Sequence, residues 1–262
     1  MKIDHRESIE DFGEQFGVDN KFNGYLASKE ILEDIVQPFN LNNIKNKSIM
    51  EVGCGSGRII QNLKKFLPKN IIGVEPSSAI EIAKKNNISS IVEFKNIKGE
   101  EIKYQNEFDY VFSLGVVHHI PNHKLVCKNI YNSLKNEGKF ICWVYGYEGN
   151  KLYLFIFNNL RRITILLPDL ILRILTNILN IIAYPYIYLC KIFPLPLKKY
   201  FIEVFDKCNY VNRNYMIFDQ LNPSYAKYFK KEEIYQLLKD SGFKKIELYH
   251  RHGYSWTAVC QK

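Results

Sequence analysis

An acid followed by three alternate glycines is the stretch of this sequence with the most evident chemistry. Glu51 precedes Gly53, Gly55 and Gly57 within the run 48–58. Glycines tolerate positive φ and let a ligand approach backbone N–H groups with no Cβ in the way. A carboxylate at this position would repel a pyrophosphate but would attract a cationic amino acid. The stretch predicts a loop that holds a ligand through its backbone and one acid.

Other ligand loops with glycines differ from this one in spacing. A P-loop needs Gly-Lys-Ser/Thr, whereas Gly57 is followed by Arg58 and Ile59. The dinucleotide fingerprint needs GxGxxG, whereas these glycines form GxGxG. A tight strand-to-helix turn without a ligand remains the alternative. A second acid, Glu75, stands 24 residues after Glu51, close to the spacing at which nucleotide-binding α/β folds place a carboxylate on the ribose hydroxyls.

Two adjacent histidines mark a second candidate site. His118 and His119 follow the apolar run Phe108-Asp-Tyr-Val-Phe-Ser-Leu114, which predicts a strand with a loop at its carboxyl end. Ligands of open parallel sheets bind outside such ends. A neutral imidazole suits a general base near pH 7. We expect one histidine, His118 ahead of His119, to act as the base and the other to make a structural hydrogen bond.

The glycine loop and the histidine-bearing run resemble motif I and motif IV of the class I S-adenosylmethionine (SAM) methyltransferases of small-molecule type. The resemblance covers roughly residues 42–145 and 229–262. It implies SAM as cofactor and S-adenosylhomocysteine as product. No metal is expected, because the cysteines and histidines lack metal-ligand spacing. The residues expected to bind the cofactor are Glu51, Gly53, Cys54, Gly55, Gly57, Glu75, Pro76, Ser113 and Leu114.

The elements that must position these residues follow an α/β order. Strands are expected near residues 49–52, 70–75, 91–94, 109–113, 139–145, 245–250 and 255–261. Together with the resemblance, they predict a Rossmann-like sheet of seven strands, the last antiparallel, with a helical cap inserted after the fifth. The expected domains are an N-terminal helical lid over 1–40, a SAM-binding core over 41–146, a cap over 147–215, and completion of the core over 216–262.

The cap segment is apolar and basic. Of the net charge of +9, six units lie within 151–200, where seven Lys/Arg oppose Asp169 alone. Prolines are expected to break its helices, and Arg173 with other polar residues interrupts its apolar run, so a transmembrane span is not predicted. Helices that cap the active site are the favoured interpretation. Contact with an anionic membrane surface and an ordinary solvated helix pair are the alternatives.

Composition favours a single α/β domain with this insertion. The chain has 262 residues, of which 47% are hydrophobic, enough for a substantial core. Its six cysteines lack metal-ligand spacing and suit a reducing cytosol, and residues 1–20 lack the apolar core of a signal peptide. We therefore predict a cytoplasmic protein, with a location at the membrane periphery as the alternative.

The prediction for function is in-line methyl transfer from SAM to O or N of a small molecule, such as an anionic, sugar-linked or lipid-linked biosynthetic intermediate. The expected substrate-binding residues are Tyr25, Tyr145, Tyr147, Tyr215, Asp219 and Tyr225. A nucleic-acid methyltransferase is the alternative. It is disfavoured because Asn/Asp-Pro-Pro-Tyr is absent after the fourth strand, where Ser113-Leu-Gly-Val stands. A non-catalytic protein of this fold, binding a membrane or a partner through its basic cap, is the other alternative.

Overall fold

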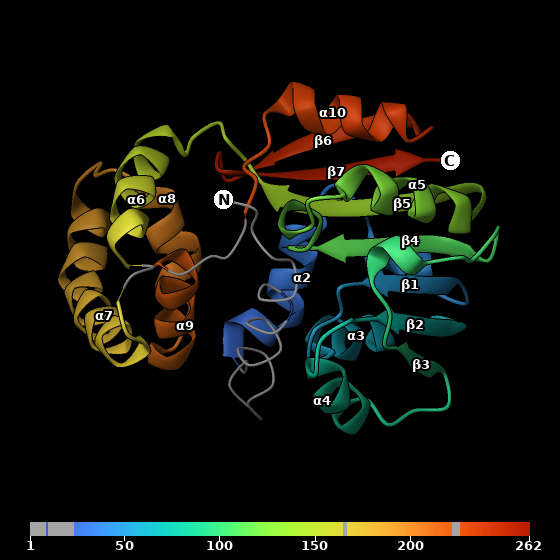
Figure 1. Cartoon of the computed structure of the whole chain (residues 1–262), viewed down its shortest axis with the longest axis horizontal. Coiled ribbons are helices and arrows are strands. Elements are labelled where there is room, and N and C mark those ends of the chain that lie inside the picture. The colour runs from blue at the N-terminus through green and yellow to red at the C-terminus, as the bar shows by residue number, and fades with distance from the viewer. Residues whose placement is uncertain (1–8, 10–23, 165–166, 222–225) are drawn as a thin grey trace. The chain divides into compact units, whose positions relative to one another are not determined.

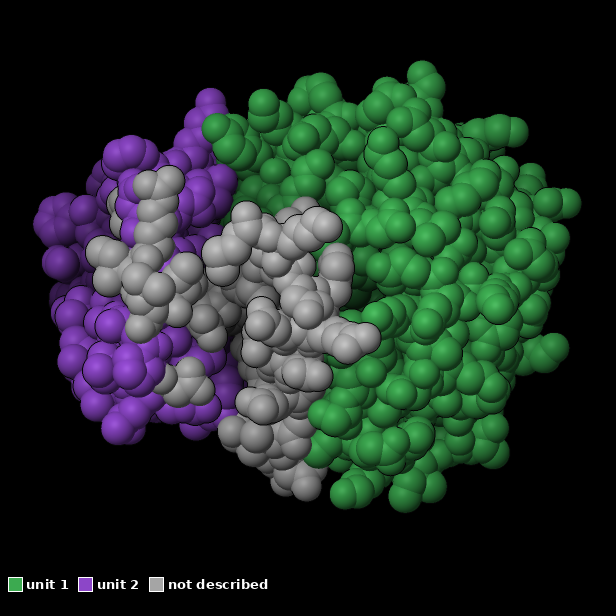
Figure 2. Space-filling view, viewed as in Figure 1, with its two compact units in different colours: residues 1–19, 29–148, 224–262 green, residues 20–28, 149–223 purple. Residues whose placement is uncertain are grey.

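The computed structural model describes Ile9 and residues 24–164, 167–221 and 226–262, without the side chains at positions 156, 162, 163, 169 and 219. The chain forms two compact units, coloured separately in Figure 2. The first comprises residues 1–19, 29–148 and 224–262, and the second residues 20–28 and 149–223. Much of the predicted N-terminal lid lies outside the described residues.

The first unit is built on a seven-stranded sheet (Figure 1). Its strand order is β3-β2-β1-β4-β5-β7-β6, and β7 runs antiparallel to both of its neighbours. The strands are β1 (Ser48–Val52), β2 (Asn70–Val74), β3 (Val92–Lys95), β4 (Phe108–Leu114), β5 (Leu134–Tyr145), β6 (Lys244–Arg251) and β7 (Ser255–Gln261). This confirms the predicted fold class.

Alternating side chains of the central strands enter two apolar layers. On one face, Met50 and Val52 of β1 pack in a cluster with Ile130 and Ile234. On the other face, Ile49 packs with a second group of buried residues that includes Leu32, Ile44, Ile60 and Leu63. Burial on both faces is typical of parallel strands between helices. The carboxyl ends of β1, β2 and β4 therefore lie on a rigid edge.

Short helices connect the strands and supply these layers. They are α2 (Lys29–Ile35), η2 (Leu41–Ile44), α3 (Arg58–Leu63), η3 (Lys64–Phe66), α4 (Ala79–Asn86), η4 (Gly99–Glu101), η5 (Val117–His119), α5 (His123–Ser133) and α10 (Lys231–Asp240). Ile130 of α5 and Ile234 of α10 belong to one layer, whereas Leu32 of α2 and Leu63 of α3 belong to the other.

The fifth strand begins earlier than the sequence predicts. β5 starts at Leu134, which pairs with Phe108, rather than at Lys139. The next pair is Tyr110 with Lys139, so the residues between Leu134 and Lys139 form an irregularity in the strand. Glu137 in this stretch has a φ of 63°. The sequence does not predict this start of the strand, because the polar residues Lys-Asn-Glu-Gly lack the alternation of a strand and do not pair regularly with β4.

The second unit is helical. It contains η1 (Gly24–Ala27), α6 (Lys151–Thr164), α7 (Asp169–Ile192), α8 (Lys198–Tyr200), the π-helical turn η6 (Phe201–Phe205) and α9 (Tyr210–Leu221). Its core contains Leu172, Ile187, Phe205 and Leu221. The Thr164 hydroxyl donates to the Leu221 carbonyl at 2.7 Å, which joins the ends of α6 and α9.

Helix α7 continues through Pro185, where the sequence predicts a break. Pro185 lies on the exposed side of the helix, where the missing N–H need not be replaced by a buried partner. Within α7, the segment Leu170–Ile192 has 23 residues and a mean hydropathy of 1.5, long and apolar enough to cross a membrane by length and composition alone. Only 28% of its most apolar window is buried inside the protein.

Candidate active site

The glycine loop joins the end of β1 to α3 in a conformation that only glycine adopts readily. Gly53, Gly55 and Gly57 have φ values of 77°, 51° and 78°. A Cβ at Gly53 would lie 2.4 Å from Cγ2 of Val116, and one at Gly57 would lie 2.3 Å from Nδ2 of Asn87. The loop is therefore shaped by close packing as well as by its backbone angles.

Glu75, directly after β2, ties this loop to the neighbouring strand. One carboxylate oxygen accepts a hydrogen bond from the Gly55 N–H at 3.0 Å, and the other accepts one from the Ser77 N–H at 2.9 Å. The side-chain amide of Asn96 donates to the Glu75 carbonyl at 2.9 Å. Each carboxylate oxygen can accept more than one hydrogen bond. Glu75 can thus hold the loop and still accept hydroxyl groups.

Glu51 is a buried acid at the end of β1. It is 1% exposed, and its Oε2 has no hydrogen-bond partner among the described residues. Burial raises the pKa of Glu51 to about 8, and the Glu75 charge contributes in the same direction, against the lowering effect of Arg58. The pKa of a buried carboxylate rises when no hydrogen-bond donor and no close cation compensates for the loss of water. A bound ammonium group would supply both.

Histidine 118 forms the centre of an aromatic cluster at the carboxyl ends of β4 and β5. Its ring lies 3.9 Å from that of Tyr145, 4.2 Å from that of His119 and 6.1 Å from that of Trp143, measured between centroids. Tyr145 in turn lies 5.3 Å from Tyr228. Trp143 and Tyr228 are members of this site that the sequence analysis missed. Trp143 and Tyr145 are two residues apart on β5 and therefore lie on the same face of the sheet, and this spacing in the sequence could have placed Trp143 beside Tyr145.

The imidazole of His118 is fully buried, and neither ring nitrogen has a hydrogen-bond partner among the described residues. Burial lowers the pKa of His118 well below the usual 6.5, and the adjacent His119 lowers it further. His118 is therefore a neutral imidazole near pH 7. Its carbonyl accepts a hydrogen bond from the Lys227 N–H at 2.9 Å, which holds the loop against residues 226–230.

Other predicted cofactor residues have structural contacts of their own. The Ser113 hydroxyl is buried and donates to the Val52 carbonyl at 3.2 Å, so it links β4 to β1. Leu114 ends β4, and Pro76 follows Glu75. Cys54 is buried, and burial followed by the charges of two nearby acids raises its pKa well above 9.0. A neutral, poorly nucleophilic thiol results.

The predicted substrate residues divide between the units. Tyr145 joins the aromatic cluster, and Tyr147 lies beside Lys230, whose Nζ is 5.5 Å from the ring centroid. Tyr25 and Tyr215 belong to the helical unit, where the Lys207 ammonium lies 5.2 Å from the Tyr25 ring. The Asp219 side chain and Tyr225 lie outside the described residues.

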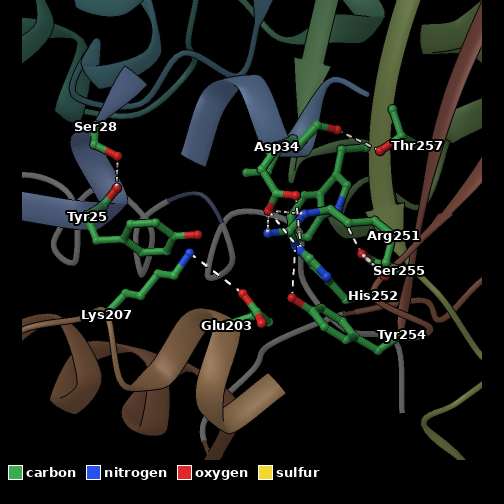
Figure 3. Close-up of polar contacts among 12 residues, drawn as sticks. Tyr25, Ser28, Asp34, Glu203, Lys207, Arg251, His252, Tyr254, Ser255 and Thr257 are labelled. Atoms are coloured by element: carbon green, nitrogen blue, oxygen red, sulfur yellow. Dashed lines mark hydrogen bonds and ion pairs between the residues drawn. The ribbon is translucent and has the colours of Figure 1, made fainter. Parts of the chain in front are cut away.

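A buried ion-pair cluster anchors α2 to the turn between β6 and β7. Figure 3 shows Arg251 and His252 directed at the Asp34 carboxylate. Arg251 is 2% exposed, and its Nε donates to Asp34 at 2.9 Å while Nη1 donates to the Tyr254 hydroxyl at 2.9 Å. The Thr257 hydroxyl also donates to the Ile35 carbonyl at 2.6 Å. These partners lie too far apart in sequence for any local pattern to predict their contact.

Comparison with known proteins identifies the class of this site. Residues 50–142 match the family model described as a methyltransferase domain. The chain is 31% identical over 113 residues to a tRNA U34 carboxymethyltransferase of Nautilia profundicola, a match covering 42% of this chain and 38% of that protein. The enzyme of the same name from Sulfurimonas denitrificans is 25% identical over 113 residues, with the same coverage. Residues 50–142 therefore form a methyltransferase domain, as the resemblance to class I SAM methyltransferases predicts.

Solved structures agree on the fold of the methyltransferase domain. A SAM-dependent methyltransferase of Mesorhizobium loti superposes with a TM-score of 0.52 at 11% identity, over 84% of this chain and 92% of that chain. SAM is the cofactor that the sequence predicts for this site. The orphan oxygen of Glu51 and the remaining acceptor capacity of Glu75 fit the ammonium and ribose hydroxyls of SAM, whereas the assignment of each predicted residue to the cofactor stays a prediction.

The curated relatives correct the predicted acceptor. Both are named for a tRNA position, so the prediction of a small-molecule substrate and the argument against nucleic acid are wrong. The absence of Asn/Asp-Pro-Pro-Tyr disfavours only methyltransferases that grip an amino nitrogen, and it does not bear on transfer to other positions of a base. The chain spans 38% of the length of these relatives.

Proposed function

We propose that this protein modifies a base of tRNA by SAM-dependent group transfer. The proposal is carried by the 31% identity over 113 residues to a tRNA U34 carboxymethyltransferase. The net charge of +9 is also suited to a polyanion, because Lys and Arg contacts with phosphates supply most of the sequence-independent affinity for nucleic acid. A tRNA acceptor agrees with the prediction of a cytoplasmic location.

The aromatic cluster supports a base as the acceptor. Proteins that act on a nucleobase take it out of its stack and hold it against aromatic side chains. The rings of His118, Trp143, Tyr145 and Tyr228 gather at the carboxyl ends of β4 and β5. Val116, in the loop that carries His118, packs against Gly53 of the glycine loop. The cluster thus lies next to the predicted cofactor site.

Each residue of the site has a role that follows from its environment. Glu51 would bind the ammonium of SAM, and Glu75 would bind the ribose hydroxyls while it fixes the glycine loop. When bound, SAM supplies the electrophilic carbon of the transferred group. The imidazole of His118 is neutral near pH 7, so one ring nitrogen carries the lone pair that would accept a proton from the acceptor base. The remainder of the rate enhancement would come from holding donor and acceptor in line.

The experiment that tests this proposal measures modification and cofactor binding separately. Purified protein is incubated with SAM and bulk tRNA that lacks the modification, and the tRNA is digested to nucleosides for mass spectrometry. We expect a mass increase on a single nucleoside, dependent on SAM and abolished when the tRNA is digested beforehand. Calorimetric titration with SAM is run on the same preparation. Binding of SAM without a mass change on any tRNA nucleoside would overturn the proposal.

A further inference from the structure

Helix α7 presents an unusually apolar face to solvent. Among its large residues that are between 48% and 65% exposed, six lie on one side of the helix and define this face: Ile171, Ile174, Ile178, Ile181, Ile182 and Tyr188. Leu170, before them, is 71% exposed. Monomeric soluble proteins rarely expose contiguous apolar surface on this scale, and such surface marks an interaction site. This side of α7 is called the apolar face below.

The opposite side of α7 is committed to the helical unit. Leu172 and Ile187 are buried in the core of that unit. The Asn180 side-chain amide donates to the Tyr210 carbonyl at 2.9 Å, and the Tyr210 hydroxyl donates to Asn177 at 2.7 Å. These bonds join α7 to α9. If α7 crossed a bilayer, these hydrogen bonds to α9 would be lost and the charged Arg173 side chain would enter the hydrocarbon core. Helix α7 is therefore suited to lie along a membrane rather than to span it.

Charge and aromatic residues favour a lipid surface over a protein partner. Between residues 149 and 221 there are nine Lys/Arg and four Asp/Glu. Lys198 and Lys199 follow the carboxyl end of α7 and form no ion pair among the described residues, whereas Lys191 pairs with Asp206 at 2.7 Å. Tyr188 is exposed on the apolar face in the last turns of α7, the end of the helix that Lys198 and Lys199 follow in the chain. Tyrosines and basic side chains at one level are typical of a membrane interface with anionic headgroups.

We propose that the apolar face of α7 docks the protein onto an anionic lipid bilayer, with its isoleucines in the acyl boundary and Lys198 and Lys199 at the headgroups. This inference is independent of the acceptor of the methyltransferase domain. It places the helical insertion at the membrane surface and leaves the packing of α7 on α9 unchanged.

Co-sedimentation with vesicles tests the docking. The full chain is mixed with vesicles of phosphatidylcholine alone and of phosphatidylcholine with phosphatidylglycerol, at low and at high salt. We expect binding to the anionic vesicles that weakens with salt. The double substitution Ile178→Glu with Ile181→Glu should reduce this binding by about tenfold or more, since each charge would have to enter the acyl boundary. A failure of the wild-type protein to bind either vesicle would overturn the proposal.

A matched control separates the apolar face from exposed apolar residues in general. Ile88, in the first unit, is 89% exposed, and Ile88→Glu should leave vesicle binding unchanged. Equal loss in both variants would contradict docking through α7. Sedimentation velocity without vesicles tests the competing occupant, a second copy of the chain. A dimer that the Ile178 and Ile181 substitutions dissociate would assign the apolar face to self-association and overturn the proposal. Circular dichroism verifies that the variants are folded.

Discussion

The ring of His118 lies 3.9 Å from the ring of Tyr145, at an interplanar angle of 33°. This contact joins the loop after β4 to the last residue of β5, and it places a buried neutral imidazole beside a phenol. The pair brings together the predicted base and one predicted substrate residue. The predictions below begin with this histidine.

Replacing His118 by Phe should preserve the ring contact with Tyr145 but remove both nitrogens. We expect kcat to fall by about a hundredfold or more, the scale of general-base catalysis, with little change in SAM affinity. In the matched variant His119→Phe we expect a loss of less than about tenfold. Because burial lowers the pKa of His118, the wild-type rate should not decline through titration of this histidine as pH falls to 6.5. A larger loss in the His119 variant would reverse the assignment.

Replacing Glu51 by Gln should remove a pH dependence of stability. The pKa of this acid is 4.5 in its ordinary state and about 8 in the folded protein without a ligand, so the folded state binds the proton more tightly. The associated stability is present below pH 4.5 and is lost as pH rises through about 8. Thermal melting of the wild type should therefore decline over this window more steeply than that of Glu51→Gln.

The same variant tests the role of Glu51 in binding the cofactor. Loss of the carboxylate charge should weaken SAM binding by about tenfold or more in a calorimetric titration, because a charge-assisted hydrogen bond is lost. Unaltered SAM affinity, together with an unaltered pH profile of melting, would show that the carboxylate faces neither the cofactor nor a buried environment.

Replacing Gly53 by Ala should destabilise the protein through two additive causes. Positive φ costs a residue with a Cβ about 1–2 kcal/mol, and the added Cβ would also lie 2.4 Å from Val116. Gly253→Ala is the matched control, because Gly253 has a φ of 80° and nothing within 4 Å of its Cβ position. Urea unfolding should give the larger loss at Gly53. A second substitution, Val116→Ala, should recover part of it, and equal losses at both glycines would refute the steric contribution.

Replacing Asp34 by Ala should leave the Arg251 charge buried without its partner. We expect a loss of about 3 kcal/mol or more in the free energy of unfolding, as for other broken buried pairs. Glu81→Ala removes an exposed ion pair with Lys84 and should cost less than about 1 kcal/mol. Burial raises the pKa of Asp34, but the charge and hydrogen bonds of Arg251, helped by His252, outweigh it and the pKa is lowered.

The lowered pKa of Asp34 gives this cluster a pH signature. Its stabilisation is present above pH 3.8 and is lost as pH falls through the lower folded value. Asp34→Asn should therefore be less sensitive to acid than the wild type in urea unfolding. Identical acid sensitivity of the two proteins would contradict the role of the ion pair.

Local pattern accounts for the parts of the fold that the sequence predicts well. Ile49, Met50 and Val52 form a strand that is buried on both faces, and Gly53 after them adopts a positive φ with no room for a Cβ. The start of β5 escapes prediction because its first pair, Leu134 with Phe108, precedes an irregular polar stretch. The continuity of α7 through Pro185 depends on which side of the helix faces solvent, and that depends on packing against α9.

The acceptor escapes prediction for a different physical reason. The glycine loop and the acid after the second strand follow a local spacing that can be recognised directly in the sequence. The aromatic cluster of His118, Trp143, Tyr145 and Tyr228 comes from three separate segments, so no single spacing in the sequence predicts it. Comparison with tRNA-modifying relatives was needed to correct the predicted substrate.

The sequence by itself determined the class of this protein: an α/β sheet with a glycine loop, one acid near the end of the first strand and one directly after the second, and a histidine-bearing loop after the fourth. These features arise from short-range periodicity and backbone preference. Only the tertiary structure decided that both nitrogens of His118 are buried with no partner in the described part of the chain, that Arg251 contacts Asp34, and that one side of α7 is exposed. Burial and charge pairing depend on residues far apart in sequence, so they exist only once the chain has folded.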